Sequence, residues 1–137
     1  MKERLMPIQE TRFEYKGFPC VVLFQPMGFR CGYVGLPKGN KYYDRDYDGI
    51  DVNCHGGLTY ARAYLALQTD NDTWWIGFDC AHCFDYYDIA KLKEYYGEDK
   101  AKEIEELFRY LSEYPFRDLE YCIEECKGMV DQIVGDA

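Results

Sequence analysis

The sequence predicts an α+β fold: a mainly antiparallel sheet from residues 11–80, packed by two to three C-terminal helices over residues 88–134. Up to residue 80, short β-branched and aromatic runs alternate with turn residues, as in a series of strands. After residue 86, apolar residues recur with the 3.6-residue period of helices. Because 137 residues suffice for one buried core, we expect a single domain over 1–137.

Five segments of the first half are expected to form strands. Residues 12–16 alternate polar and aromatic side chains, and 20–24 form a β-branched apolar run. The turn residues between these two segments predict a hairpin. Residues 30–36 and 58–64 are predicted as further strands. The most strand-like segment of the chain, 73–79, is expected near the centre of the sheet.

Three helices are predicted over 88–96, 99–114 and 118–134, each beginning at an aspartate that can cap its first turn. Gly97 can end the first helix. The apolar stripe of the second helix consists of Ile104, Leu107, Phe108 and Leu111. The third helix follows the helical period closely, with a stripe of Leu119, Cys122, Ile123, Cys126, Met129, Val130 and Ile133.

Charge and composition limit the classes of partner. The net charge of −9 and the pI near 4.7 describe a surface that repels phosphate backbones, so direct nucleic-acid binding is not expected. The first seven residues lack an apolar signal region, and no stretch approaches the length of a membrane span. The seven cysteines are therefore expected to be reduced thiols or metal ligands in a cytoplasmic protein, not a disulfide framework.

Both histidines lie in segments that combine glycine, cysteine and aspartate, over 54–60 and 74–85. Imidazole is the side chain best suited to proton transfer near neutral pH and the commonest metal ligand. The two segments therefore indicate one site. We expect its ligand-binding residues to be His55, Gly56, Gly57, Thr59, Tyr60, Trp75, Asp79, His82 and Asp85.

Such a site would hold a small polar or nucleotide-like ligand. The histidines would contact its polar or anionic groups, and the backbone N–H groups of Gly56 and Gly57 would face an anion. Asp79 would orient a histidine or accept a hydrogen bond from the ligand. One of the two adjacent tryptophans would form an apolar wall with Tyr60.

Convergence of these residues depends on the end of the 73–79 strand. In an extended strand Asp79 and His82 face opposite sides, so they meet only if the chain bends near residue 80. Without that convergence, His82 is a hydrogen-bonded histidine at a strand end and the two glycines are only a turn.

The same residues also permit metal chemistry. His55, Asp79 and His82, the candidate catalytic residues, would hold zinc or another divalent metal in a hydrolase, with one histidine as ligand and the other as general base. A closed zinc site would instead use Cys80 and Cys83, which have CxxC spacing, with the segment at 54–55. A cysteine nucleophile paired with a histidine would be Cys54 or Cys80, although no spacing favours it.

The loop expected over residues 37–57 contains a partial calcium motif. Asp44, Asp46, Asp48 and Gly49 match the first half of a D-x-D-x-D-G loop. The twelfth position is His55, where a calcium loop requires a bidentate glutamate. The alternative is a solvated acidic loop, or one that mimics a phosphate backbone.

Segments 55–60 and 74–82, with Tyr15-Lys16-Gly17 and Cys20-Val21-Val22 upstream, resemble small uncharacterised proteins from phages and prophages of Gram-positive bacteria. The resemblance extends to about residue 96 and carries no known activity. It implies a context, because small acidic phage proteins often inhibit host systems. They do so by mimicking DNA, blocking an enzyme, or sequestering or destroying a nucleotide signal.

Three functional hypotheses follow. The first is a phage-type accessory protein of the host cytosol, acting in counter-defence or host takeover by binding a small polar or nucleotide-like ligand. The second is a metal-dependent hydrolase that uses the same histidines and aspartates. The third is an acidic inhibitor of a host protein, or a DNA mimic, without a small-molecule site. Only the second requires catalysis, and none requires a membrane.

Overall fold

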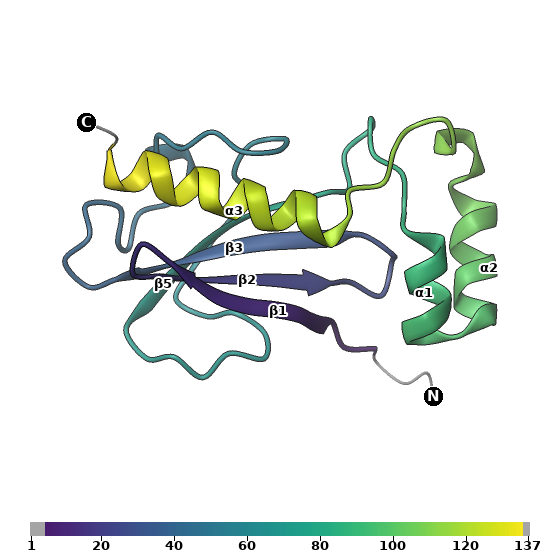
Figure 1. The fold of residues 1–137 in the computed structure, drawn as a ribbon, viewed down its shortest axis with the longest axis horizontal. Helices are drawn as coiled ribbons and strands as arrows, with labels where there is room; N and C mark the ends of the chain where they lie inside the picture. Colours follow the sequence, from purple (N-terminus) through teal and green to yellow (C-terminus); the bar gives the residue numbers. More distant parts are fainter. Residues whose placement is uncertain (1–4, 136–137) are drawn as a thin grey trace.

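The computed structural model describes residues 5–135 and contains one five-stranded sheet with three α-helices (Figure 1). The strand order is β1-β2-β3-β5-β4, and every neighbouring pair is antiparallel. This confirms the predicted α+β class. Residues 1–4 and 136–137, which the single-domain prediction also includes, lie outside the described residues. The strands are β1 (Ile8–Tyr15), β2 (Phe18–Phe24), β3 (Arg30–Pro37), β4 (Tyr60–Arg62) and β5 (Thr73–Asp79).

The first two strands form the predicted hairpin, but the turn comes one residue earlier than expected. Lys16 and Gly17 both have positive φ, at 50° and 86°. Two positive φ values in succession are the signature of the tight turn that matches the twist of paired strands. Phe18 therefore pairs with Tyr15 and belongs to β2.

The fifth strand lies between β3 and β4, so β3 and not β5 is central. Its side chains alternate as predicted: Ile76 and Phe78 pack in the cluster beneath α3, whereas Trp75 lies in the cluster on the other face. The fourth strand is shorter than the predicted 58–64 and covers only three residues at the sheet edge.

The three helices are α1 (Ile89–Tyr96), α2 (Glu98–Leu107) and α3 (Leu119–Val134). Asp88 and Asp118 cap α1 and α3, as the sequence predicts. The second helix departs from the prediction: it begins after Gly97 instead of at Asp99, and it ends at Leu107. A short 3₁₀ turn, Arg109–Leu111, replaces the expected last helical turn to about residue 114. Leu107, expected on the apolar stripe, is 58% exposed.

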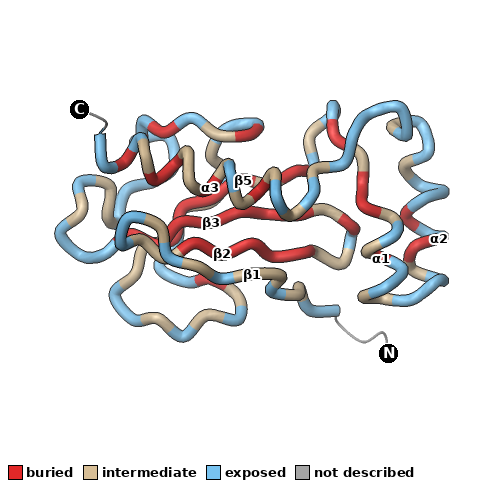
Figure 2. The backbone as a smooth tube through the Cα atoms, in the orientation of Figure 1, coloured by how far each residue is buried: buried red, intermediate tan, exposed pale blue. Residues whose placement is uncertain are grey.

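The helices cover the sheet unequally. The third helix lies across one face, while α1 and α2 pack beyond one end of the strands (Figure 1). The loop after β3 closes the rest of the helix-covered face with the buried side chains of Ile50 and Val52. On the opposite face, the segment after β4 contributes only one buried side chain, Leu65. Figure 2 shows that β2 and β3 are nevertheless buried along most of their length.

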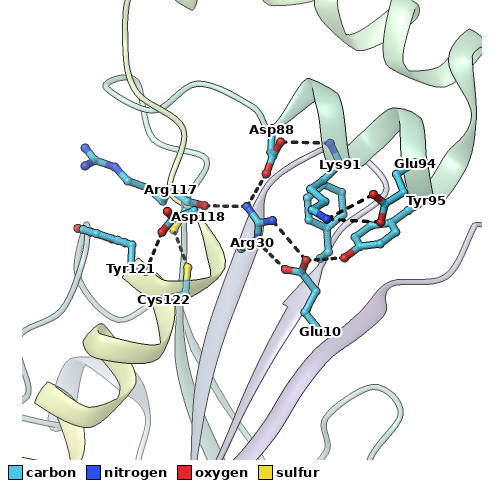
Figure 3. Close-up of polar contacts among 12 residues, drawn as sticks. Glu10, Arg30, Asp88, Lys91, Glu94, Tyr95, Arg117, Asp118, Tyr121 and Cys122 are labelled. Carbon is cyan, nitrogen blue, oxygen red and sulfur yellow. Dashed lines mark hydrogen bonds and ion pairs between the residues drawn. The ribbon is translucent and has the colours of Figure 1, made fainter.

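A buried ionic network attaches α1 to the sheet (Figure 3). Arg30 of β3 is 2% exposed and binds the carboxylates of Glu10 and Asp88 and the backbone oxygen of Arg117. Tyr95 of α1 donates a further hydrogen bond of 2.7 Å to Glu10. Burial opposes the charge of Arg30, but the two carboxylates outweigh it and hold the pKa of the guanidinium above its ordinary value.

Within residues 5–135, no helix combines the length and the apolar character that crossing a bilayer requires.

Candidate functional site

The chain bends where β5 ends, as the convergence of Asp79 and His82 requires. The Asp79 carboxylate accepts a hydrogen bond of 3.1 Å from the backbone N–H of Ala81, which turns the chain out of the sheet. A second turn follows, in which the N–H of Asp85 donates to the backbone oxygen of His82. These bonds place His82 Nε2 3.6 Å from Asp79 Oδ1. The two predicted site residues therefore lie together.

His55 is a buried structural bridge, with 3% of its side chain exposed. Its Nε2 lies 2.8 Å from Asp85 Oδ2, and its Nδ1 lies 2.7 Å from the hydroxyl of Tyr121 on α3. Its backbone N–H donates to Glu125 of the same helix at 2.7 Å. Because both ring nitrogens are engaged, His55 would bind a ligand or metal only after releasing Asp85 or Tyr121.

Asp85 is the hub of this network and is 1% exposed. Besides His55, it accepts hydrogen bonds from the Nε of Arg117 at 2.9 Å and from the backbone N–H of His82 at 3.1 Å. The hydrogen bond that Arg117 donates to Asp85 is the main cause that raises the pKa of the Arg117 guanidinium. One carboxylate thus joins the loop before β4, the bend after β5 and the start of α3.

His82 occupies the space that Gly56 leaves open. Its ring stacks on Phe84, with ring centroids 5.6 Å apart and planes 10° apart. Its Nε2 is buried and has no hydrogen-bond partner among the described residues; the Asp79 carboxylate is its polar neighbour. A Cβ at position 56 would overlap the imidazole. The sequence predicts that Gly56 and Gly57 present their backbone N–H groups to a ligand. In the structure Gly56 instead makes room for the His82 ring, and the N–H of Gly57 donates a hydrogen bond to the backbone oxygen of Cys54.

We expect Gly56→Ala to displace the His82 ring and to lower the free energy of unfolding by about 2 kcal/mol, because a positive φ of 68° and a steric clash act together. Gly57→Ala is the matched control: its φ of 86° is also positive, but no atom lies within 4 Å of the added Cβ. NMR of the imidazole and urea unfolding measure both effects. Equal losses in the two variants would contradict the steric contact.

Thr59, Tyr60 and Asp79 line a hollow of about 400 Å³ at the end of β5. Thr59 donates a hydrogen bond of 2.9 Å to Asp79. In the strand register, Gly77 lies between Tyr33 of β3 and Tyr60 of β4. Because glycine has no side chain, the two rings meet edge to face, with centroids 5.2 Å apart. The remaining lining residues are Gln25, Phe29, Cys31, Phe78 and Ala81.

The tryptophans do not contribute to this hollow, contrary to the prediction for Trp75. Trp75 is 1% exposed and packs in the core with Val21 and Leu23. Trp74 faces the other side of the sheet and donates its indole N–H to the backbone oxygen of Arg45. Tyr33 supplies the aromatic wall instead.

The cysteines have local roles. Cys80 faces Cys122 in the core, with sulfur atoms 3.8 Å apart, while Cys83 is exposed, so the CxxC pair does not converge. Burial raises the pKa of the Cys54 thiol to about 12, which disfavours the nucleophilic thiolate.

The acidic loop has a local structural role. Asp46 of the calcium-like motif caps a short 3₁₀ turn, Tyr47–Gly49. Within residues 5–135, no three His, Cys, Asp or Glu side chains form a metal-holding group.

Comparisons with protein-family models, with curated proteins and with solved structures gave no match for this chain. The resemblance to phage proteins therefore stays a prediction from the sequence. The candidate site is argued from its own geometry: a buried histidine–aspartate network behind the bend, and an open hollow lined by Asp79, Thr59 and two tyrosines.

Proposed function

We propose that this chain is a binding protein whose hollow at the end of β5 takes a small polar or nucleotide-like ligand with a planar part. We further propose that it acts in the host cytosol as a phage-type accessory protein, in counter-defence or host takeover. The observation that carries the binding proposal is the meeting of a fixed carboxylate, a hydroxyl and two aromatic rings in one hollow of about 400 Å³. Ligand sites have this size and this mixture of apolar walls and few polar groups.

The Asp79 carboxylate is held in place for recognition. Thr59 donates to one of its oxygens and the Ala81 backbone to the other. Each carboxylate oxygen has a further lone pair to accept a hydrogen bond from a ligand. Because these partners fix the side chain before binding, a ligand loses less free energy in ordering it.

The tyrosines suit the planar part of the ligand. The ring of Tyr60, at the sheet edge, is half-buried and lies beside the carboxylate end of the hollow. Aromatic faces of this kind stack on nucleobases and other flat groups. The proposal requires no catalysis, since His55 lies outside the lining of the hollow and is engaged by Asp85 and Tyr121.

The test is an NMR titration of the protein with adenosine, adenosine monophosphate and tyramine. We expect at least one of these probes to shift the amide signals of Thr59, Tyr60 and Ala81, and Tyr60→Leu to weaken that binding at least about tenfold through the lost ring contact. The control is Tyr110→Leu, which removes a 72%-exposed ring remote in sequence from the hollow. Shifts absent from the hollow with all probes, or binding unchanged in Tyr60→Leu, would contradict the proposal.

A further inference from the structure

A second hollow of about 550 Å³ adjoins the first on the same side of the sheet. The two share Gln25, Tyr33 and Tyr60, so they form one continuous groove. The added part is apolar, and its other lining residues are Leu5, Met6, Pro7, Leu23, Pro26, Tyr64, Leu65 and Ala66.

The groove has one acidic side chain. Among the described residues that line it, Asp79 is the only Asp, Glu, Lys, Arg or His. Burial raises the pKa values of Tyr33 and Tyr60, so both phenols stay neutral. Within residues 5–135, the imidazole Nε2 of His82 lies 3.6 Å from Asp79 Oδ1, and no lysine or arginine forms an ion pair with this carboxylate. The carboxylate thus lies beside aromatic and aliphatic surface without a permanent counter-charge.

We propose that the ligand of this groove is an organic cation: an ammonium or guanidinium group attached to an aromatic or aliphatic body. This inference rests on the proposed function and specifies its ligand. The cation pairs with Asp79, and the apolar body lies along the tyrosines and the second hollow. Of the ligands named in the proposed function, this inference selects a polar cation over a nucleotide, because an anionic phosphate would meet the carboxylate with no lysine or arginine in the lining to offset the repulsion.

The aromatic lining favours the same ligand class. Positive groups are attracted to the faces of tyrosine and phenylalanine rings, and recognition sites for ammonium groups combine such rings. Tyr33, Tyr60 and Phe29 lie along the groove beside Asp79.

The test compares three probes of one shape and different charge: 2-phenylethylamine, 2-phenylethanol and 3-phenylpropanoate. We expect the amine to bind in the groove at least about tenfold more tightly than the alcohol, and the propanoate more weakly still, because charge-assisted hydrogen bonds are stronger than neutral ones. Asp79→Asn should reduce the affinity for the amine to that for the alcohol. Asp72→Asn is the matched control, because it removes the same charge from a 68%-exposed carboxylate paired with Lys38.

An additional peptide probe distinguishes two sources of such a cation: a free small amine and a lysine side chain of a protein partner. N-acetyl-phenylalanyl-lysine amide binding in place of the free amine would assign the groove to a lysine side chain of a protein partner, which supports the inference equally. Equal binding of amine and alcohol by the wild-type protein would overturn the cation assignment while leaving the groove as a ligand site. If neither these probes nor the nucleosides shift groove signals, the proposed function fails as well. The wild-type series gives these answers even if Asp79→Asn does not fold.

Discussion

Asp85→Ala is expected to lower the free energy of unfolding by about 3–5 kcal/mol, the cost of removing one partner from a buried ionic network. The carboxylate is 1% exposed and accepts hydrogen bonds from His55, Arg117 and the backbone N–H of His82. Alanine leaves these three donors without their acceptor. Because they come from three separate segments, the loss also releases the start of α3 from the bend after β5.

Urea unfolding followed by tryptophan fluorescence measures this loss, with the exposed Asp51→Ala as control. The control should stay within about 0.5 kcal/mol of the wild type. Asp85→Asn should fall between the two, because the amide keeps the shape but has only one acceptor oxygen for the three donors. A loss below about 1 kcal/mol in Asp85→Ala would show that the network does not stabilise the fold.

The network gives His55 a role different from the one its residue type suggests. Through Asp85, His55 stabilises the bend after β5 on the side away from the groove. The bend in turn positions the Asp79 carboxylate in the lining of the groove. A substitution of His55 would therefore alter ligand binding through the position of Asp79, without contact between the imidazole and the ligand. Binding lost in a His55 variant is for this reason weaker evidence than binding lost in Tyr60→Leu.

The sequence predicted the elements with strong periodicity and missed the interactions between distant segments. The third helix and its Asp118 cap follow from local signals that survive in the fold. The alternation in β5 correctly placed Trp75 and Asp79 on one face, but periodicity does not distinguish a core position from a groove position. Trp75 is covered by Leu65, whereas Asp79 lies at the strand end, where no segment covers it fully.

Tyr33, Tyr121 and Arg117 were not predicted as partners of the site. The hydrogen bond from Tyr121 to His55 joins residues 66 positions apart in the sequence, and no local sequence pattern predicts a contact between such distant residues. Tyr33 has one usable signal in the sequence: Gly32 and Gly35 lie in the same strand, and glycine within a strand often permits close approach of another group. The Tyr33 ring, however, lies over Gly77 of the paired strand β5, and this pairing follows only from the strand register.

Arg30→Met should have an effect as large as Asp85→Ala, a loss of about 3–5 kcal/mol, because it leaves Glu10 and Asp88 as buried carboxylates without a counter-charge. Arg12→Met is the matched control. Arg12 also pairs with a carboxylate, that of Asp70, but both side chains are partly exposed. Such pairs contribute about 0–1 kcal/mol. Urea unfolding at neutral pH measures the difference.

A double-mutant cycle with Glu10→Gln tests whether charge pairing causes the loss. Neutralising Glu10 removes one of the two carboxylates that Arg30→Met exposes to an apolar environment, so the double variant should lose less than the sum of the single losses, by about 1 kcal/mol or more. Asp88 must stay, because its other oxygen caps α1 through the N–H of Lys91. Additive losses would instead indicate that Arg30 acts by packing, through its stem and its contact with the Phe24 ring at 5.0 Å.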